Sequence, residues 1–251
     1  MSELRIDLLR HGDTGRRGYR GQLDDPLSGR GWAQLNDAVD GHEWDWIVAS
    51  PLRRCAQFAD ALARRRRLPL TLDARLAEYH FGDWQGVPMA TLAERHGDAL
   101  GRFWADPVAH PPPAAEPFMA FVARLRAALD AIVAGRAPAC ARVLVVTHGG
   151  AIRALRCIAE ARAFADASAF DVAHASLYPL RWPPAHGAAG ASAQASTCAH
   201  APAPAATLRP TVERPRDPPS GAGCAAAIGH AQDATAPAPA RGATPGPARR
   251  R

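Results

Sequence analysis

The N-terminal sequence changes from apolar to polar within Leu8-Leu9-Arg10-His11-Gly12-Asp13-Thr14. The apolar run from Leu4 to Leu9 stops at an Arg-His pair followed by glycine, which is typical of a β-strand that ends in a tight polar loop. In open α/β sheets, ligands bind at the carboxyl ends of the strands. An imidazole beside a guanidinium at such a strand end therefore predicts an anion-binding site, and phosphate is the anion we expect.

A second strand end carries a similar signature. The continuous apolar run of residues 142–147 (RVLVVT) predicts a buried parallel strand. His148-Gly149-Gly150 follows at once, and a helix is expected from Ala151 to Ile158. The backbone amides at the start of a helix bind anions, so His148 and Gly149 are candidate binding residues. One strand-end histidine is more often structural than functional, but two of them on separate strands favour a shared site.

A third motif, Ser50-Pro51, has the composition of a helix start. It follows an expected strand from Trp44 to Ala49 and opens an expected helix from Leu52 to Arg66. Arg53 and Arg54 fall in the first turn, where the helix dipole disfavours cations. A bound phosphate would offset that cost, whereas the alternative is that both arginines face solvent.

Two more segments carry polar residues without a fixed role. Glu78 lies within an aromatic, glycine-broken stretch at residues 76–86, which we interpret as a wall over a pocket. Its carboxyl group is either a proton donor or a surface group that reaches water beside an aromatic cluster. The loop at residues 15–21 is either a cationic rim that attracts a phosphorylated substrate or a solvated surface, and the sequence assigns no role to its Arg16, Arg17 and Arg20.

Periodicity predicts the remaining elements. Helices are expected after a Ser28 cap and over residues 89–104 and 118–133, with short strands at 68–72 and 170–180. Pro111-Pro112-Pro113 requires a loop. The region from Pro88 to Pro117 resembles an insertion that could cap the site and select the substrate.

Composition limits the classes of function. The chain has 251 residues, 47% of them apolar, and its 30 basic residues are all arginine. The excess of basic over acidic residues lies mostly after residue 182, which argues against a nucleic-acid-binding domain. The five cysteines show no metal-ligand spacing, and no apolar run approaches the roughly 18 residues that span a bilayer. We therefore expect a cytoplasmic enzyme that does not bind membranes.

The composition changes at Pro183 to Ala, Pro, Gly, Ser and Thr. Such a segment cannot bury enough apolar surface to offset its chain entropy. We predict a folded domain over residues 1–182 and a disordered C-terminal tail over residues 183–251.

Four motifs in this order resemble the histidine phosphatase superfamily, across residues 4–180. They are Arg10-His11-Gly12 with Thr14, Ser50-Pro51-Leu52-Arg53-Arg54, Glu78 before Phe81-Gly82-Asp83-Trp84, and Thr147-His148-Gly149-Gly150. Within the superfamily, segments 19–27 (YRGQLDDPL) and 101–107 (GRFWADP) look most like bacterial α-ribazole phosphatases. The resemblance implies an α/β fold, a three-layer α/β/α sandwich with a mostly parallel central sheet.

The resemblance also implies the chemistry. Neutral His11 would attack the phosphorus and become phosphohistidine. Glu78 would protonate the leaving alkoxide and then deprotonate the water that hydrolyses the intermediate. Arg10, Arg54 and His148 would complete the catalytic set by stabilising the charge of the phosphoryl oxygens. The residues expected to bind the substrate phosphate are Arg10, Thr14, Arg54, His148 and Gly149. The arginines would replace a metal ion, so neither a metal nor a cofactor is expected.

The sequence departs from the family in one place that matters. Arg17 stands where many members carry an asparagine, six residues after the nucleophile, which puts that phosphate contact in doubt.

The substrate is less determined than the reaction. A small phosphorylated metabolite is the expected partner, with α-ribazole 5′-phosphate of cobalamin nucleotide-loop assembly as the first choice. A broad-specificity phosphomonoesterase is the main alternative, and a phosphoglycerate mutase is a weaker one because the expected folded core ends near residue 182. A non-catalytic phosphate-binding protein would be expected to have lost His11 or Glu78. The sequence leaves the oligomeric state open.

Overall fold

The computed structural model describes residues 4–135 and 140–182. Its centre is a five-stranded sheet in which only the edge strand β5 is antiparallel to its neighbour, β1. The strand order across the sheet is β3 (Leu70–Leu72), β2 (Trp46–Ala49), β4 (Arg142–Thr147), β1 (Arg5–Arg10) and β5 (Leu177–Leu180). The expected mostly parallel α/β sheet is confirmed.

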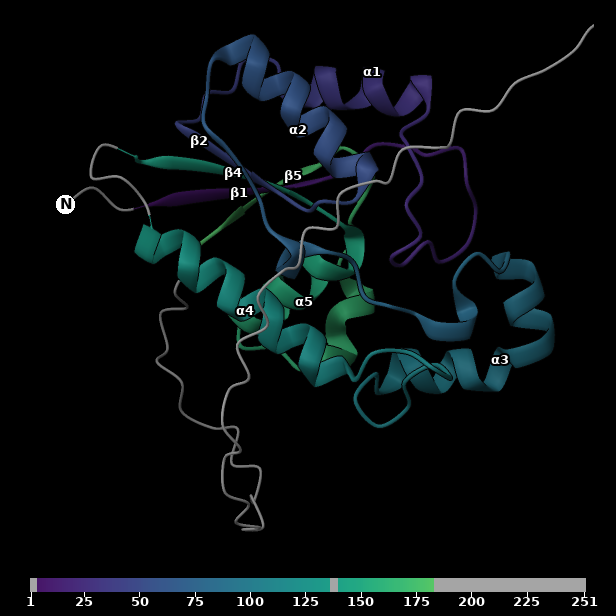
Figure 1. Ribbon diagram of the computed structural model, residues 1–251. Helices are drawn as coiled ribbons and strands as arrows, with labels where there is room; N and C mark the ends of the chain where they lie inside the picture. The colour runs from purple at the N-terminus through teal and green to yellow at the C-terminus, as the bar shows by residue number, and fades with distance from the viewer. Residues whose placement is uncertain (1–3, 136–139, 183–251) are drawn as a thin grey trace, which may run out of the picture. The chain divides into compact units, whose positions relative to one another are not determined.

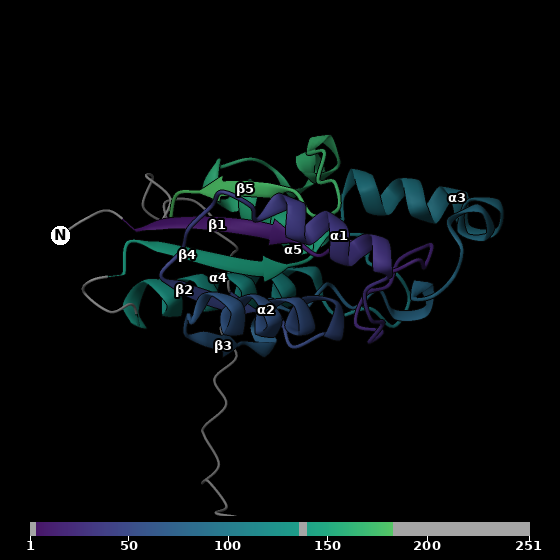
Figure 2. The ribbon, with the colours of Figure 1, turned by 90° about the horizontal axis from the view of Figure 1, so that it is seen from above.

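Helices cover both faces of the sheet (Figure 1). Two pack on one face, α1 (Gly29–Ala38) and α2 (Arg53–Arg66), and two on the other, α4 (Phe118–Gly135) and α5 (Gly149–Ala159). The helix α3 (Met89–Ala105) lies beyond the end of the sheet toward which β1 and β4 point (Figure 2). Three short 3₁₀ helices complete the described chain, at Ala74–Leu76, Gly82–Trp84 and Phe164–Ala169.

The alternation of side chains along the strands builds a core on each face. Leu8 and Val145 belong to the cluster that packs under α4 and α5, whereas Leu9 and Val146 belong to the cluster under α1 and α2. All four side chains have an exposed fraction of 0%. Strand β4 is apolar without interruption because both of its faces are buried, as expected for a central parallel strand.

Ser28 caps α1 as predicted, and α2 begins one residue later than predicted. Ser28 accepts a hydrogen bond from the amide of Gly31, as an N-cap residue should. The helix α2 begins only at Arg53, and its N-cap residue Leu52 makes no side-chain cap. The hydroxyl of Ser50 is instead 2.8 Å from Nε2 of His148. The same hydroxyl accepts a hydrogen bond of 3.4 Å from the amide of Leu52, so this serine contacts both the segment that leads into α2 and His148 of the site.

The last strand is shorter than predicted. Strand β5 covers only Leu177–Leu180, and the preceding residues form an irregular segment. That segment departs from the sheet because Val172 and His174 reach across to the Arg10 side chain. The predicted disorder of residues 183–251 lies outside the described residues.

Two glycines allow the loop after β1 to approach α1 closely. A Cβ atom added to Gly12 would lie 2.2 Å from the carbonyl oxygen of Gly31, and one added to Gly31 would lie 2.0 Å from the carbonyl oxygen of Asp13. Only backbone fits between these segments. The contact fixes the position of the loop that carries His11.

Candidate active site

The two strand-end histidines lie together. The ring centroids of His11 and His148 are 5.3 Å apart, at the carboxyl ends of the adjacent strands β1 and β4. A cavity of about 450 Å³ opens beside them, lined by fifteen further residues as well as by His11 and Arg10. Two segments 137 positions apart in the sequence therefore meet at one site, as the resemblance implied.

His11 is held in the form that a nucleophile needs. Its Nδ1 is 2.8 Å from the carbonyl oxygen of Gly12, and since a carbonyl only accepts, Nδ1 carries the proton and Nε2 keeps its lone pair. Burial, followed by the charges of Arg54 and Arg10, lowers the pKa of His11 well below its ordinary value. The ring is therefore neutral at physiological pH.

His148 is buried more deeply than His11, with an exposed fraction of 0%. Its Nδ1 accepts a hydrogen bond of 3.2 Å from Nε of Arg54, so its Nε2 carries the proton and donates to the Ser50 hydroxyl. Burial and the nearby Arg54 lower the pKa of His148 well below its ordinary value. Both ring nitrogens are occupied by protein groups, and the ring does not line the cavity.

Arg54 is buried, with an exposed fraction of 1%, and its guanidinium group hydrogen-bonds to His148 and to two backbone carbonyls. Its Nη1 donates to the carbonyl oxygen of Leu23 at 2.7 Å and its Nη2 to that of Gly21 at 2.6 Å. Two backbone carbonyl groups, one at the end of the loop of residues 15–21 and one two residues later, therefore offset this cation at the start of α2. Arg53, in contrast, is exposed. The solvent-facing alternative thus describes Arg53 but not Arg54.

Arg10 is oriented by the segment that precedes β5. Its Nη1 donates to the carbonyl oxygen of Val172, and its Nη2 is 2.9 Å from Nε2 of His174. Its Nε is buried and has no partner among the residues that the structure describes. Burial lowers the pKa of Arg10, and the nearby Arg153 adds to that effect. An anion in the cavity would satisfy both the free Nε and the charge.

Glu78 is fixed by backbone amides. Its Oε1 accepts from the amides of Tyr79 at 3.0 Å and Ala151 at 3.1 Å, and its Oε2 accepts from Gly150 at 2.9 Å. The start of α5 therefore binds a carboxylate of the protein itself, rather than leaving all of its amides for a ligand. The exposed fraction of Glu78 is 9%, and the residue still lines the cavity, so it is not the surface group of the alternative interpretation.

The other predicted residues divide into two groups. Thr14 and Gly149 line the cavity, and the Thr14 hydroxyl accepts from the amide of Arg16 at 3.3 Å. Arg16 and Arg20 also line it, but Arg20 forms an ion pair of 2.7 Å with Asp25, and the side chain of Arg16 is 67% exposed. Arg17 does not line the cavity.

Two cavity residues were missed by sequence reasoning. His174, whose ring centroid is 5.5 Å from that of His11, lies in a segment for which the sequence predicts only a strand. Arg153 lies five residues after His148 on α5, and nothing in the sequence distinguishes it from other helical arginines. The aromatic residues Tyr19, Phe81 and Trp104 form the outer wall of the cavity.

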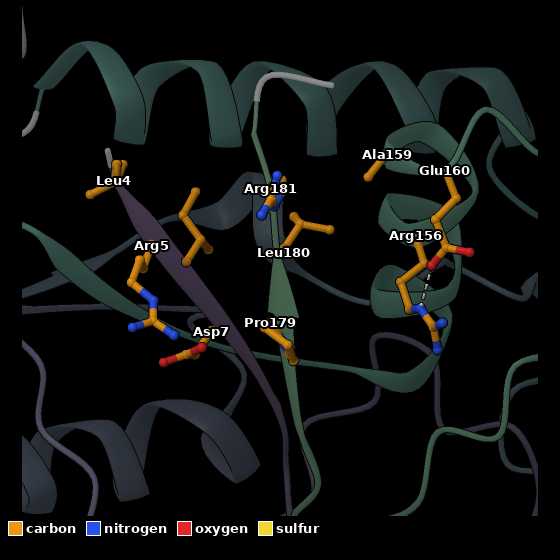
Figure 3. A pocket seen from close by; sticks show the side chains of 10 residues that line it. Leu4, Arg5, Asp7, Arg156, Ala159, Glu160, Pro179, Leu180 and Arg181 are labelled. Carbon is orange, nitrogen blue, oxygen red and sulfur yellow. Dashed lines mark hydrogen bonds and ion pairs between the residues drawn. The ribbon is translucent and has the colours of Figure 1, made fainter. Parts of the chain in front are cut away.

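A larger cavity, of about 630 Å³, lies at the opposite end of β1 (Figure 3). Its lining includes Arg5 and Asp7 of β1, together with Arg156 and Glu160, which form an ion pair of 3.0 Å. No histidine lines it. His11 and Glu78 line the smaller cavity and not the larger one, so we consider the smaller cavity the candidate active site.

The described residues offer neither a metal-ligand cluster nor a membrane-spanning helix. Across residues 4–135 and 140–182, no three His, Cys, Asp or Glu side chains are grouped as ligands for a metal ion. Within the same ranges, no helix combines the length and the apolar character needed to cross a membrane.

Comparison with known proteins assigns the family. The fold and the paired histidines define an α/β protein with a polar cavity at the carboxyl ends of two parallel strands. The family model of the histidine phosphatase superfamily (branch 1) matches residues 6–191. The chain therefore belongs to the histidine phosphatase superfamily, as its motifs indicated.

Several of the relatives that the chain matches are named as phosphatases. The chain is 36% identical over 169 residues to a glucosyl-3-phosphoglycerate phosphatase of Mycobacterium tuberculosis, covering 62% of this chain and 74% of the relative. The structure of a mycobacterial glucosyl-3-phosphoglycerate phosphatase matches with a TM-score of 0.63 and 32% identity, over 70% of this chain and 89% of that one.

Two further matches bear on specificity and on length. The α-ribazole phosphatase from Shigella flexneri matches with a TM-score of 0.59 and 25% identity, over 70% of this chain and 89% of that one. A bifunctional protein of Mycobacterium tuberculosis is 35% identical over 158 residues, which are 60% of this chain but only 43% of that protein. The chain thus spans less than half of some curated relatives that it matches.

Proposed function

We propose that this protein hydrolyses phosphomonoesters of small metabolites through a phosphohistidine intermediate on His11. The observation that carries the proposal is the state of that ring: its Nδ1 is bound to the Gly12 carbonyl, and its unprotonated Nε2 lies in a cavity with Arg10 and Glu78. A neutral imidazole among cations is a nucleophile for a dianionic phosphoryl group.

The reaction has two steps. In the first, Nε2 of His11 forms a bond to phosphorus while the ester P–O bond breaks, and the carboxyl group of Glu78 gives its proton to the leaving alkoxide. In the second, the Glu78 carboxylate removes a proton from water. The resulting oxygen nucleophile bonds to phosphorus, the N–P bond breaks, and inorganic phosphate leaves with His11 restored.

The arginines supply electrostatic stabilisation. The free, buried Nε of Arg10 is directed by the bonds of its two Nη groups to Val172 and His174. Arg54 keeps one hydrogen on each Nη group beyond the carbonyl bonds it makes. Both can bind the equatorial oxygens of the phosphoryl group as its charge shifts. His148, with both nitrogens engaged, acts in this arrangement by orienting Arg54.

Two substrate assignments follow from different observations. The segments at 19–27 and 101–107 support α-ribazole 5′-phosphate. The higher identity to the structure of a glucosyl-3-phosphoglycerate phosphatase, 32% against 25% for the α-ribazole phosphatase structure, supports a phosphorylated glycerate derivative. A broad-specificity phosphomonoesterase would accept both.

The test of the reaction uses the full chain with p-nitrophenyl phosphate in the presence of EDTA. The parent protein should release p-nitrophenol, and His11→Ala should abolish turnover. Glu78→Gln should accumulate an acid-labile phosphoenzyme, since p-nitrophenolate needs little protonation to leave but the attacking water still lacks its base. His110→Ala and Glu94→Gln, at exposed positions outside the site, are matched controls that should retain parental rates. Parental activity in His11→Ala would refute the proposal.

A further inference from the structure

The cavity around His11 carries more positive charge than one phosphoryl group requires. Its lining contains a single carboxylate, Glu78, but five arginines: Arg10, Arg16, Arg20, Arg54 and Arg153. Arg20 is neutralised by Asp25, and the Glu78 carboxylate is already held by three backbone amides. If Arg10 and Arg54 bind the reacting phosphoryl group, Arg153 is the remaining arginine of the lining that forms no ion pair within the described residues, since Arg16 also lies 3.9 Å from Asp25.

Arg153 lies on α5, one turn after Gly149, with its guanidinium group in the cavity. Its Nε donates a hydrogen bond of 3.2 Å to the carbonyl oxygen of Phe170, which fixes the direction of the side chain. Within residues 4–135 and 140–182, neither Nη group has a hydrogen bond or an ion pair. Four N–H donors therefore remain for a ligand.

The guanidinium groups of Arg153 and Arg10 approach the same point. The position of a Cβ atom added to Gly149 lies 3.2 Å from Nη1 of Arg153 and 3.2 Å from Nε of Arg10. Two cations this close repel each other, and Arg153 contributes to the lowered pKa of Arg10. An anion bound beside Arg153 would relieve that repulsion.

The surroundings of Arg153 strengthen such an interaction. Arg153, Phe81 and Trp104 also line a small apolar cavity that adjoins the catalytic one. The Tyr19 hydroxyl accepts a hydrogen bond of 2.8 Å from Nε1 of Trp104, so two of the aromatic residues that line the catalytic cavity are fixed relative to each other. An ion pair against such a wall is less screened by water than one on an open surface.

We propose that Arg153 binds a second anionic group, a carboxylate or a phosphate, on the alcohol part of the substrate. The inference rests on the proposed function and narrows it to acidic phosphomonoesters. A substrate whose alcohol is neutral, as in α-ribazole 5′-phosphate, would leave Arg153 without its anion.

The experiment compares substrates that differ in one group. 3-Phosphoglycerate and glycerol 3-phosphate differ by a carboxylate against a hydroxymethyl group, and fructose 1,6-bisphosphate and fructose 6-phosphate differ by a second phosphate. The ratio of kcat/KM within each pair is measured with the parent protein and with Arg153→Met, Arg153→Lys and the exposed control Arg126→Met. p-Nitrophenyl phosphate reports the basal reaction.

The parent should prefer the acidic member of at least one pair by about tenfold or more, and Arg153→Met should abolish that preference through KM. Arg153→Lys should restore part of it, and Arg126→Met should keep it. Which pair responds identifies the carboxylate or the phosphate as the second anion. A parental ratio near one, a preference that survives Arg153→Met, or an equal loss of kcat on all substrates would overturn the proposal. Absence of all phosphatase activity in the parent would instead refute the proposed function.

Discussion

At the scale of single residues, the site depends on which ring nitrogen carries a proton. The Gly12 carbonyl sets the tautomer of His11, and Arg54 sets that of His148. The two histidines have similar sequence surroundings but different hydrogen-bonding states. The His11 ring has one nitrogen without a protein partner, whereas both nitrogens of the His148 ring are hydrogen-bonded, to Arg54 and to Ser50. Equivalent motifs therefore supply the proposed nucleophile in one case and a support for a cation in the other.

His174 should behave as a positioning residue that acts through Arg10. Desolvation and the Arg10 charge lower its pKa to about 4, so at neutral pH its Nε2 accepts a hydrogen bond from the Arg10 guanidinium. His174→Ala should raise both KM and the inhibition constant of inorganic phosphate by about tenfold, because a hydrogen bond to a charged group is lost. His174→Gln, which keeps an acceptor, should recover most of the affinity.

The control for that prediction is His110→Ala, which removes an imidazole away from the site. Phosphate inhibition separates a positioning role from a general loss of folded protein, since unfolding lowers the apparent kcat without changing the inhibition constant. Parental phosphate inhibition in His174→Ala would show that Arg10 is held by Val172 alone.

At the scale of elements, the start of α5 connects the catalytic groups. The amides of Gly150 and Ala151 bind the Glu78 carboxylate, so the position of this helix sets the position of the acid. Strand β4, which precedes it, is buried on both faces and paired on both edges. Strand β4 thus fixes the position of the first turn of α5, and that turn fixes the carboxylate of Glu78, some 70 residues earlier in the chain.

Gly150→Ala tests this connection. A Cβ atom at position 150 would lie 2.5 Å from Oε1 of Glu78, so the carboxylate must move. A displacement near 1 Å should lower kcat by about a hundredfold while the protein remains folded. Gly101→Ala is the matched control: its Cβ would enter open space on α3, and the helix propensity of alanine should raise the free energy of unfolding by up to about 1 kcal/mol. Parental kcat in Gly150→Ala would contradict the proposed role of the amides.

At the scale of the whole molecule, burial of two neutral histidines makes stability depend on pH. The pKa values of His11 and His148 lie well below 6.5 in the folded state, whereas an unfolded histidine titrates near 6.5. As the pH falls below 6.5, the unfolded chain takes up protons that the folded chain excludes. This contribution to stability is thus fully present above pH 6.5 and is lost as the solution becomes more acidic.

The two buried groups together should cost about 3 kcal/mol of unfolding free energy between pH 7.5 and 5.5, and His174, whose pKa is lowered to about 4 although its side chain is exposed, should add a smaller cost. Urea denaturation at several pH values measures this change in unfolding free energy. The interval from pH 7.5 to 5.5 lies above the pKa values of ordinary carboxyl groups, so carboxyl titration contributes little to it. His148→Gln should make the slope shallower by about half, and His110→Ala should leave it unchanged. A free energy that is constant across this interval would rule out burial of both rings in the neutral form.

The predicted domain boundary can be tested by truncation after Trp182. The indole of Trp182 donates a hydrogen bond of 2.7 Å to Asp130, so this residue should be retained. We expect removal of residues 183–251 to leave kcat/KM and Tm nearly unchanged. A large decrease in either would show that the folded unit extends beyond residue 182.

The sequence alone was sufficient for the alternation that places β1 and β4 in a buried sheet and for the strand ends that carry His11 and His148. These features depend on the order of neighbouring residues, because periodicity and glycine after a strand are local properties. The same local signals assigned Ser50 only to a helix start, whereas its hydroxyl also pairs with His148, 98 positions away.

Only the tertiary structure decided what each polar group does. The assignment of the α5 amides to Glu78, the bonding of Arg54 to loop carbonyls, and the approach of Arg153 to Arg10 all join segments distant in the chain. The sequence lists the available donors and acceptors, but their partners depend on which strand and helix ends meet in space. That choice follows from the packing of the sheet and its two helical layers, which no short stretch of sequence contains.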